Sequence, residues 1–267
     1  MQAAAEYRYP HFKRKLLVED MLSFRGGPDP GEAFPDFDLL TIDNRRLQKS
    51  DVIEKRPVLL SIGSYTCPMT ASSAPILKRL YEEFGDQVEF MTLYVREAHP
   101  GEHFNQTETI EQKVKYAQEF KERDQIPWTI AVDDVDGTLH QKLGSHPNAT
   151  YILDSSGNVA FRVLWSNDGR SLRKGLKAVL SGRSGERRPK VVPMLAGMGS
   201  MPESLERSGP TAKRDVLRQA PPMYFMAQIA KQFRPLSPLQ RGVATLATVM
   251  LTGGLAIGAV GLLRNRG

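Results

Sequence analysis

One continuous apolar run, followed at once by a helical pattern, constrains the fold of this chain more than any other feature. The run covers residues 58–63 and is almost entirely aliphatic, as expected of a strand covered on both faces of a sheet. The helical pattern extends from Thr70 to Phe84, and Gly85 is suited to end it. A strand of this kind needs helices on both faces of its sheet, so we predict an α/β fold.

Strand and helix patterns continue to alternate as far as residue 182. A strand-like segment at 33–43 precedes the central run, and further strands are predicted at 88–95, 128–132, 150–153 and 158–163. Helices are predicted at 110–123, 138–143 and 171–180. This order implies a thioredoxin-like, three-layer α/β/α domain with a mixed central sheet over residues 31–182.

Cys67 is the only cysteine among the 267 residues, and it lies between the apolar strand and the helix. A thiol at a helix N-terminus feels the positive end of the helix dipole and unpaired backbone N–H groups, which favour the thiolate. Since the thiolate is the nucleophile, this position suits catalysis. A buried cysteine that serves only as a small apolar residue is the alternative.

Pro75 stands inside the helical pattern, where a proline costs about 3 kcal/mol and kinks the helix. Its position resembles that of the proline that thioredoxin-fold proteins carry eight residues after their first active-site cysteine. The resemblance aligns Cys67 with that cysteine and Thr70 with the second cysteine of the pair. It implies a thiol that has no cysteine partner in its own chain.

Three motifs lie at the ends of predicted strands: Gly-Ser-Tyr-Thr-Cys-Pro at 63–68, Leu-Tyr-Val-Arg-Glu-Ala-His-Pro at 93–100, and Pro-Asn-Ala-Thr-Tyr at 147–151. Together they resemble the iodothyronine deiodinase family, over about residues 34–163. The family holds a selenocysteine in the first motif, so the resemblance implies a selenium-free homologue that uses Cys67 for reductive chemistry. It also implies that Glu97 and His99 of the second motif belong to the site. Tyr65 departs from the family, which has a second cysteine at that place.

The strands at 58–64 and 88–95 should be parallel neighbours, so Cys67 and His99 should leave the same edge of the sheet. His99 can then either deprotonate the thiol or stabilise the thiolate as an ion pair. Glu97 can orient His99 or balance its charge. The hydroxyls of Thr66 and Thr70 can bind the thiolate or, equally well, cap the helix.

Pro147, by the same resemblance, occupies the place where this fold keeps a cis-proline beside the nucleophile. The four histidines of the predicted domain lack the spacing of zinc ligands, so we predict no metal and no bound cofactor. An external thiol of the glutathione or thioredoxin type is then required to return oxidised Cys67 to the thiol.

The basic residues of the chain are concentrated in one segment. Between residues 181 and 241 eleven Lys and Arg stand against four Asp and Glu, while the whole chain has a net charge of +6. We predict a mostly disordered linker at 183–241, with a juxtamembrane amphipathic stretch at 224–234 or, alternatively, a solvated one. We predict no nucleic-acid binding, and a flexible N-terminal arm at 1–30.

Residues 242–263 carry no charge and, at 1.5 Å per residue, span roughly 33 Å, enough to cross the apolar core of a bilayer. We predict a single C-terminal transmembrane helix in contact with lipid, with a buried core helix as the alternative. The denser basic residues before it place the redox domain on the cytoplasmic side. Gly254 and Gly258 would allow a homodimer through close helix packing.

The resemblance favours a membrane-anchored, deiodinase-like thiol oxidoreductase. In this reading Cys67 attacks a halogen, a peroxide oxygen or a disulfide sulfur of its substrate. Leu60 and Ser64 stand where peroxiredoxins carry a proline and a threonine, which disfavours a one-cysteine peroxidase. A membrane-tethered binding or scaffold module that has lost turnover is the alternative from another class.

Overall fold

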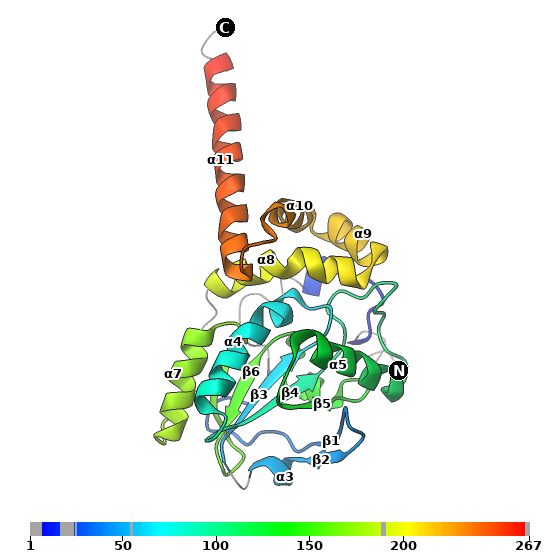
Figure 1. Ribbon diagram of the computed structural model, residues 1–267, viewed down its shortest axis with the longest axis vertical. Coiled ribbons are helices and arrows are strands. Elements are labelled where there is room, and N and C mark those ends of the chain that lie inside the picture. The colour runs from blue at the N-terminus through cyan, green and yellow to red at the C-terminus, as the bar shows by residue number, and fades with distance from the viewer. Residues whose placement is uncertain (1–6, 17–23, 25, 54–55, 188–190, 265–267) are drawn as a thin grey trace.

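The computed structural model describes residues 7–16, 24, 26–53, 56–187 and 191–264; of residues 186, 187, 191 and 253–264 it describes only the backbone. Within these ranges an eight-stranded mixed sheet has the strand order β2-β1-β5-β4-β3-β6-β7-β8 (Figure 1). The strands are β1 (Asp38–Thr41), β2 (Arg46–Gln48), β3 (Val58–Gly63), β4 (Glu89–Tyr94), β5 (Thr129–Val132), β6 (Thr150–Leu153), β7 (Val159–Val163) and β8 (Gly185–Arg187).

The helices fall into two groups along the chain. Those of the sheet domain are α3 (Lys49–Ile53), α4 (Pro68–Phe84), α5 (Ile110–Asp124), α6 (Thr138–Lys142) and α7 (Gly169–Leu180). Those that follow it are α8 (Val191–Ser208), α9 (Pro210–Gln219), α10 (Pro221–Ala230), the 3-10 turn η1 (Lys231–Phe233) and α11 (Pro238–Arg264). The predicted thioredoxin-like α/β domain with a mixed sheet is confirmed, and β8 was not predicted.

The three central strands run parallel. β3 pairs with β4 from Val58 opposite Glu89 to Gly63 opposite Tyr94, and β4 pairs with β5 in the same sense. β6 pairs antiparallel with the other side of β3 and continues through a turn into β7. Because parallel strands end at one edge of a sheet, the residues that follow β3 and β4 meet there, as predicted.

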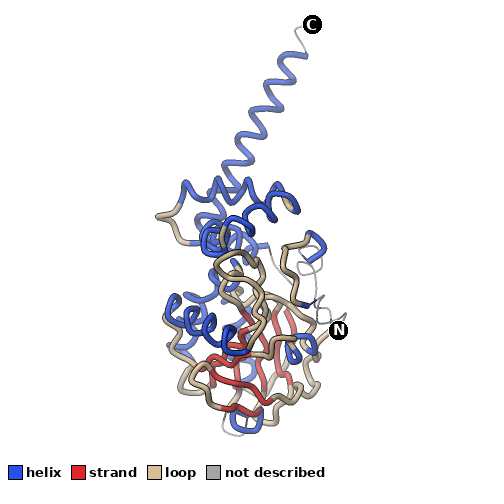
Figure 2. The backbone as a smooth tube through the Cα atoms, turned by 90° about the vertical axis from the view of Figure 1, so that its right-hand side faces the viewer, coloured by secondary structure: helices blue, strands red, loops and turns tan. Residues whose placement is uncertain are grey.

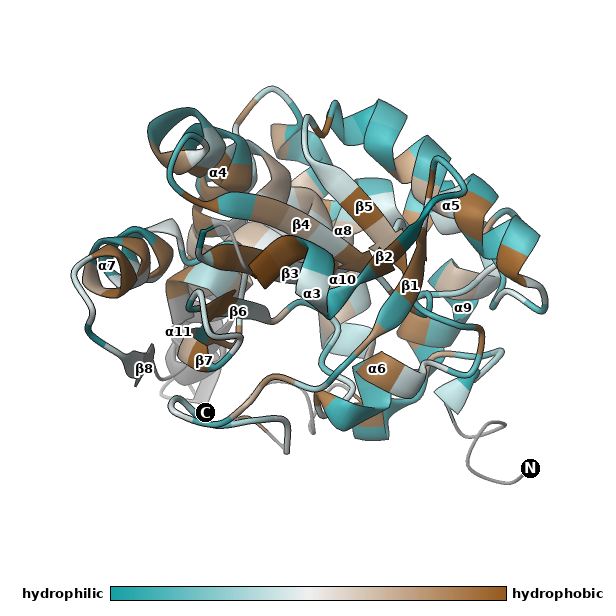
Figure 3. Cartoon of the chain, turned by 90° about the horizontal axis from the view of Figure 1, so that it is seen from below, coloured by the Kyte–Doolittle hydropathy of each residue, from teal (hydrophilic) through white to brown (hydrophobic). Residues whose placement is uncertain are grey.

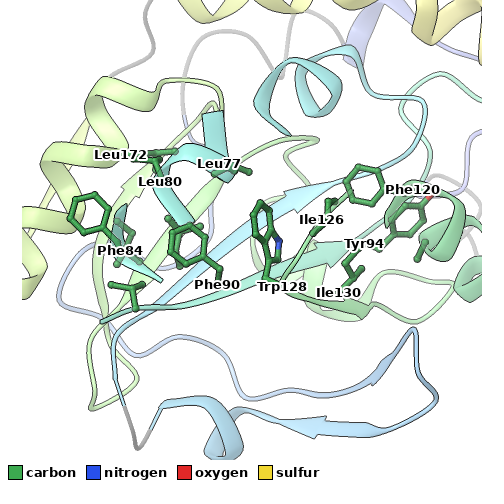
Figure 4. Packing of buried hydrophobic residues seen from close by; sticks show 14 of the residues in the cluster. Leu77, Leu80, Phe84, Phe90, Tyr94, Phe120, Ile126, Trp128, Ile130 and Leu172 are labelled. Carbon is green, nitrogen blue, oxygen red and sulfur yellow. The ribbon is translucent and has the colours of Figure 1, made fainter. Parts of the chain in front are cut away.

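The sheet separates two apolar layers. Leu59 of β3 faces the layer under α4, α5 and α7, whereas Leu60 and Ile62 face the layer covered by α3 and α6. Figure 4 shows the first layer, in which Leu80 of α4 lies over the sheet near Phe90. In Figure 3 the central strands are the brown, hydrophobic part of the domain, and the helices turn teal faces outward.

The largest difference from the sequence prediction lies in the segment 183–241. From residue 191 it is helical, and α8, α9 and α10 lie across the edge of the sheet where β3 and β4 end (Figures 1 and 2). Met201 of α8 and Val216 of α9 form a separate apolar cluster with Phe12. This segment is therefore a packed cover over the domain, and the predicted disordered linker is wrong.

The positions of two prolines explain why the helices were missed. Pro210 and Pro221 lie in the first turns of α9 and α10. A proline there loses no hydrogen bond, because the first N–H groups of a helix have no partner in any case. The same prolines, read along the sequence, look like interruptions.

The N-terminal residues also differ from the prediction. Tyr7, Tyr9 and Phe12 are buried in the domain and its cover. Arg96 donates to the carbonyl oxygen of Tyr7 at 2.9 Å and lies over both tyrosine rings. The described part of the arm is thus packed in place by aromatic side chains.

The basic residues of the predicted juxtamembrane stretch are paired within the protein. Glu206 of α8 binds Lys231 at 3.0 Å and Arg234 at 2.6 Å. Arg241, at the start of α11, is buried and binds Glu203 at 2.5 Å. These ion pairs hold α8 against η1 and α11, whereas the prediction directed Lys231 and Arg234 toward lipid headgroups.

α11 leaves the cover as a single long helix (Figures 1 and 2). In the part of the chain that the structure describes, no helix is both long and apolar enough to cross a membrane. The predicted transmembrane segment 242–263 continues past residue 252, and from there its side chains lie outside the described residues. The predicted dimer contact at Gly254 and Gly258 lies outside them as well.

Gly242 of α11 lies where this helix touches α8. A Cβ at this position would come within 1.9 Å of the carbonyl oxygen of Leu195. We expect Gly242→Leu to push the helices apart and to lower the free energy of unfolding by about 1–3 kcal/mol in chemical denaturation. Val243→Leu at the exposed neighbouring position is the matched control and should change it by less than about 0.5 kcal/mol. Equal losses in the two variants would contradict this close packing.

Candidate active site

Cys67 lies immediately before α4 and is only 2% exposed. Its backbone is extended, and its carbonyl oxygen accepts the N–H of Ala71 at 3.0 Å, so Cys67 is the N-cap of the helix. Pro68 occupies the first turn, where a proline is tolerated. The positive end of the helix dipole therefore lies at the thiol, as the sequence predicted.

Glu97 follows β4 and holds the loop that carries Cys67. One oxygen of its buried carboxylate accepts the backbone N–H of Thr66 at 2.9 Å and the Thr66 hydroxyl at 2.7 Å. The Thr66 hydroxyl oxygen in turn accepts the backbone N–H of His99 at 3.1 Å. The loops after β3 and β4 are thus joined through one carboxylate and one hydroxyl.

Tyr94 and Gln106 fix Glu97 from the other side. The Tyr94 hydroxyl donates to the second carboxylate oxygen, and the Gln106 side chain bonds both the N–H and the C=O of Glu97, at 3.0 and 2.7 Å. Burial raises the pKa of Glu97, while the donors Thr66 and Tyr94 act to lower it. Glu97 therefore orients the two loops and does not touch the imidazole of His99 through any of these bonds.

His99 is 5% exposed, and burial lowers its pKa from 6.5 to about 4. Its Nδ1 is buried and has no hydrogen-bond partner among the described residues. The imidazole is consequently neutral near pH 7. Of the two roles considered for it, general base fits this state, whereas a resting imidazolium beside a thiolate does not.

Phe12 packs directly against the imidazole of His99. Its ring lies on the imidazole with a centroid separation of 4.6 Å. Asp215 of α9 accepts the backbone N–H of Phe12 at 3.3 Å and contacts Nδ1 of His11 at 3.0 Å. The burial of His99 therefore depends on two segments, one from each end of the chain.

Cys67 and His99 line the same pocket, which has a volume of about 600 Å³. Its walls also include Pro147 and Trp165 of the sheet domain and several methionines of α8 and α10. Most of the residues that line the pocket are apolar, and α8 and α10 form part of its wall.

The other predicted site residues are placed differently. The Thr70 hydroxyl accepts the side-chain N–H of Asn148 at 3.2 Å and does not border the pocket. Pro147 borders it, and no peptide bond in the described ranges is cis. Pro75 lies within α4, about two turns beyond Cys67, and is exposed. Among the residues that the structure describes, no three His, Cys, Asp or Glu side chains come together as a metal site.

Sequence reasoning missed Tyr94, Phe12, Trp165 and the helical cover. Tyr94 stands three residues before Glu97, at the end of a strand, and this spacing was an available signal for it. Phe12 and Trp165 lie outside any motif, and only tertiary packing brings them to the thiol.

We expect His99 to make stability depend on pH. Its pKa is lower in the folded state than the ordinary 6.5, so the unfolded chain takes up the proton first as the pH falls. The fall from pH 7 to pH 4 should cost up to about 3 kcal/mol of unfolding free energy, and His99→Gln should remove that part. The exposed His103 gives the control His103→Gln. Identical pH profiles for the wild type and His99→Gln would contradict the buried neutral imidazole.

We expect Thr66→Val to disturb the thiol as well as the fold. The change leaves Glu97 and the His99 N–H each short of a partner, at a cost of about 1–3 kcal/mol. It should also lower the rate at which iodoacetamide alkylates Cys67, since the two loops lose their link. Thr70→Val also breaks a buried hydrogen bond, to Asn148, but should leave the alkylation rate unchanged. Equal alkylation rates in both variants would show that Thr66 has no positioning role.

Comparison with known proteins identifies the family of this chain. The family model for iodothyronine deiodinase matches residues 14–163. Thyroxine 5-deiodinase of Sparus aurata is 22% identical over 152 residues, which cover 52% of this chain and 56% of that protein. Type II iodothyronine deiodinase of Homo sapiens is 38% identical over 48 residues, 18% of each chain. The matches thus span between a fifth and little more than half of these relatives.

Among solved structures, a thiol-disulfide oxidoreductase from Bacteroides fragilis aligns with a TM-score of 0.43 and 17% identity, over 55% of this chain and 98% of that chain. A thioredoxin family thiol:disulfide interchange protein from Chlorobium tepidum aligns with a TM-score of 0.43 and 13% identity, over 59% and 99%. The family match covers more than half of the chain and includes Cys67, Glu97 and His99. The chain belongs to the iodothyronine deiodinase family.

Proposed function

We propose that this protein is a thiol-dependent oxidoreductase in which Cys67 attacks an electrophilic atom of a small molecule. One observation carries the proposal: the only cysteine caps a helix and lines the same covered pocket as a buried histidine that is neutral near pH 7. The family match adds support, because it includes both residues.

In the proposed reaction His99 accepts the thiol proton, and the thiolate sulfur then attacks the substrate. The sulfur loses two electrons to the substrate, and His99 returns the proton to the leaving group. Two equivalents of an external thiol, of the glutathione or thioredoxin type, reduce Cys67 again and leave as a disulfide. Glu97 and Thr66 hold the reacting side chains in place and take no proton.

The pocket favours a small substrate over a protein disulfide. Cys67 is 2% exposed, and α8 and α10 cover its side of the sheet. Disulfide exchange also commonly uses a second cysteine, and Thr70 occupies that place. Deiodinase-like reductive dehalogenation and related thiol-dependent reductions remain compatible with the site.

We further propose that residues 242–263 anchor the protein in a membrane, with the redox domain on the cytoplasmic side. The support comes from the uncharged sequence of this segment and from exposed apolar side chains on the described part of α11, among them Val243 and Met250. Attachment of the full chain to phosphatidylcholine vesicles in a flotation experiment, lost in a chain ending at residue 237, tests this part independently of the chemistry.

The redox proposal is tested with the full chain in phosphatidylcholine vesicles, glutathione and three sets of probes: iodinated phenols, hydroperoxides and low-molecular-weight disulfides. We expect glutathione-dependent reduction of at least one set, with loss of at least about 100-fold in Cys67→Ser and of about 10- to 100-fold in His99→Gln. His103→Gln is the matched control and should keep the full rate.

A non-catalytic scaffold is the competing function. It predicts that none of the probes is reduced and that Cys67→Ser behaves like the wild type in cells. That pair of results would overturn the redox proposal.

A further inference from the structure

A second groove lies where the cover meets the sheet domain. It has a volume of about 650 Å³ and shares no lining residue with the pocket of Cys67. Its walls come from α4, α7, α8 and the first turn of α11. The side chain of Asn167, just before α7, donates to the Ser72 hydroxyl of α4 at 2.7 Å and to the carbonyl oxygen of Pro193 in α8 at 2.8 Å. The groove thus follows a junction that hydrogen bonds hold together.

Apolar side chains from three helices line one part of this groove. They are Ile76 and Leu80 of α4, Val192 and Pro193 of α8, and Leu239 of α11. Val192 and Leu239 are 56% and 40% exposed, although both are large apolar residues. An exposed apolar patch with polar residues at its rim is typical of a contact with a ligand, a protein or a membrane.

α11 extends this apolar part of the groove away from the domain. Leu239, Val243, Leu246 and Met250 follow one another at helical spacing, so they share one face of α11. All four are exposed, from 37% for Leu246 to 69% for Met250. At 1.5 Å per residue this apolar stripe is roughly 16 Å long. In Figure 1 it belongs to the helix that rises from the cover above α4. A flexible hydrocarbon chain could lie along it.

Four exposed cations line the same groove: Arg79 of α4, and Arg170, Arg173 and Lys174 of α7. The three on α7 lie in its first two turns, and the first turn contains no acidic residue. Their charges repel one another and oppose the positive end of the helix dipole. Such a local conflict is typical of a functional site, and an anion in the groove would relieve it.

Two carboxylates reduce this positive charge but do not cancel it. Asp168 lines the groove and accepts both the N–H and the hydroxyl of Ser171, at 3.1 and 2.7 Å. Glu83 binds Arg173 at 2.6 Å. In the part of the chain that the structure describes, the side chains of the other three cations form neither an ion pair nor a hydrogen bond. These three are therefore free to bind an anion from outside the protein.

We propose that this groove binds an anionic phospholipid, with its phosphate between Arg79 and Arg170 and one acyl chain along the stripe on α11. A guanidinium group binds phosphate oxygens through paired hydrogen bonds. An acidic peptide would match the cations but not the stripe, and free phosphate would leave the whole apolar part exposed. The inference is independent of the redox chemistry. It adds a lipid-specific contact to the proposed anchor, because a groove at the foot of α11 would lie at the level of the headgroups.

The test is a lipid titration of the full chain in dodecyl maltoside, followed by native mass spectrometry. The lipids are phosphatidylglycerol and phosphatidylcholine with identical acyl chains. We expect one phosphatidylglycerol to bind per chain, at least about 10-fold more tightly than phosphatidylcholine.

The double variant Arg79→Gln/Arg170→Gln should weaken binding of phosphatidylglycerol by about 10- to 30-fold and leave phosphatidylcholine unchanged. The matched control Arg214→Gln/Arg218→Gln removes two exposed arginines of α9, outside the groove, and should change neither lipid. Since Arg79 and Arg170 are exposed, their double variant should keep the wild-type midpoint in chemical denaturation. A loss of lipid binding is then separate from a loss of the fold.

The stripe is tested through Leu246→Gln, which should weaken both lipids by about 3- to 10-fold because it removes apolar contact with the chain. Leu217→Gln, at an exposed position of α9 outside the groove, is the control and should have no effect. The soluble headgroup glycerophosphoglycerol, which lacks acyl chains, should not displace phosphatidylglycerol.

Three results would overturn the inference. Equal affinities for the two lipids would remove the anionic specificity. Displacement of phosphatidylglycerol by an equal concentration of glycerophosphoglycerol or inorganic phosphate would indicate a site for free anions. Displacement by an equal concentration of hexaglutamate, with no effect of Leu246→Gln, would indicate an acidic protein partner. Failure of Cys67 to reduce any probe would leave the inference standing.

Discussion

The carboxylate of Glu97 is the contact on which the candidate site depends. It lies after β4 but bonds the backbone and side chain of Thr66, which lies after β3. Parallel pairing of the two strands brings these loops to one edge, yet strand pairing alone does not fix loops to within a hydrogen bond. The Thr66 hydroxyl in turn accepts the backbone N–H of His99, so the position of His99 is fixed as well. One buried acid thereby sets the mutual position of the loops that carry Cys67 and His99.

A buried carboxylate needs donors, and every donor here has a second purpose. Tyr94 holds the acid and also accepts the N–H of Tyr65 at 3.3 Å, in the loop that leads to Cys67. The Gln106 side chain bonds both the backbone N–H and the backbone C=O of Glu97. The site is therefore a set of loops cross-linked by polar groups, held between an apolar sheet below and an apolar cover above.

The sheet domain could be predicted from sequence because its signals are local. The apolar run that became β3, the helical pattern of α4 and the turn between β6 and β7 each occupy a few consecutive residues. Cys67 was singled out by its place between a strand and a helix, whereas Glu97 and His99 were singled out by the resemblance of their motif to the deiodinase family. The cover could not be predicted in this way. Two of its helices, α9 and α10, begin with prolines, and the apolar faces of the cover pack against Phe12 and the thiol pocket, which are remote in sequence.

The predicted roles of individual side chains were less secure than their positions. Thr66 and Thr70 were predicted to serve Cys67 in the same way, but the first bonds Glu97 and the second bonds Asn148. Glu97 was expected to act on the imidazole of His99, and its bonds instead fix the loops. Which group a loop side chain bonds depends on residues that follow other strands. Sequence spacing does not reveal these partners.

The position of the cover in the chain has a consequence for the order of assembly. Strands β1 to β7 and both loops of the site precede residue 182, whereas the helices that enclose the thiol follow β8. Domains generally fold in the order of synthesis, with the N-terminal parts first. A newly made sheet domain would thus present Cys67 to solvent until α8, α9 and α10 had followed it. Enclosure of the thiol therefore comes after the central strands and their loops have been made, and a chain interrupted before α8 would carry Cys67 without the cover of its pocket.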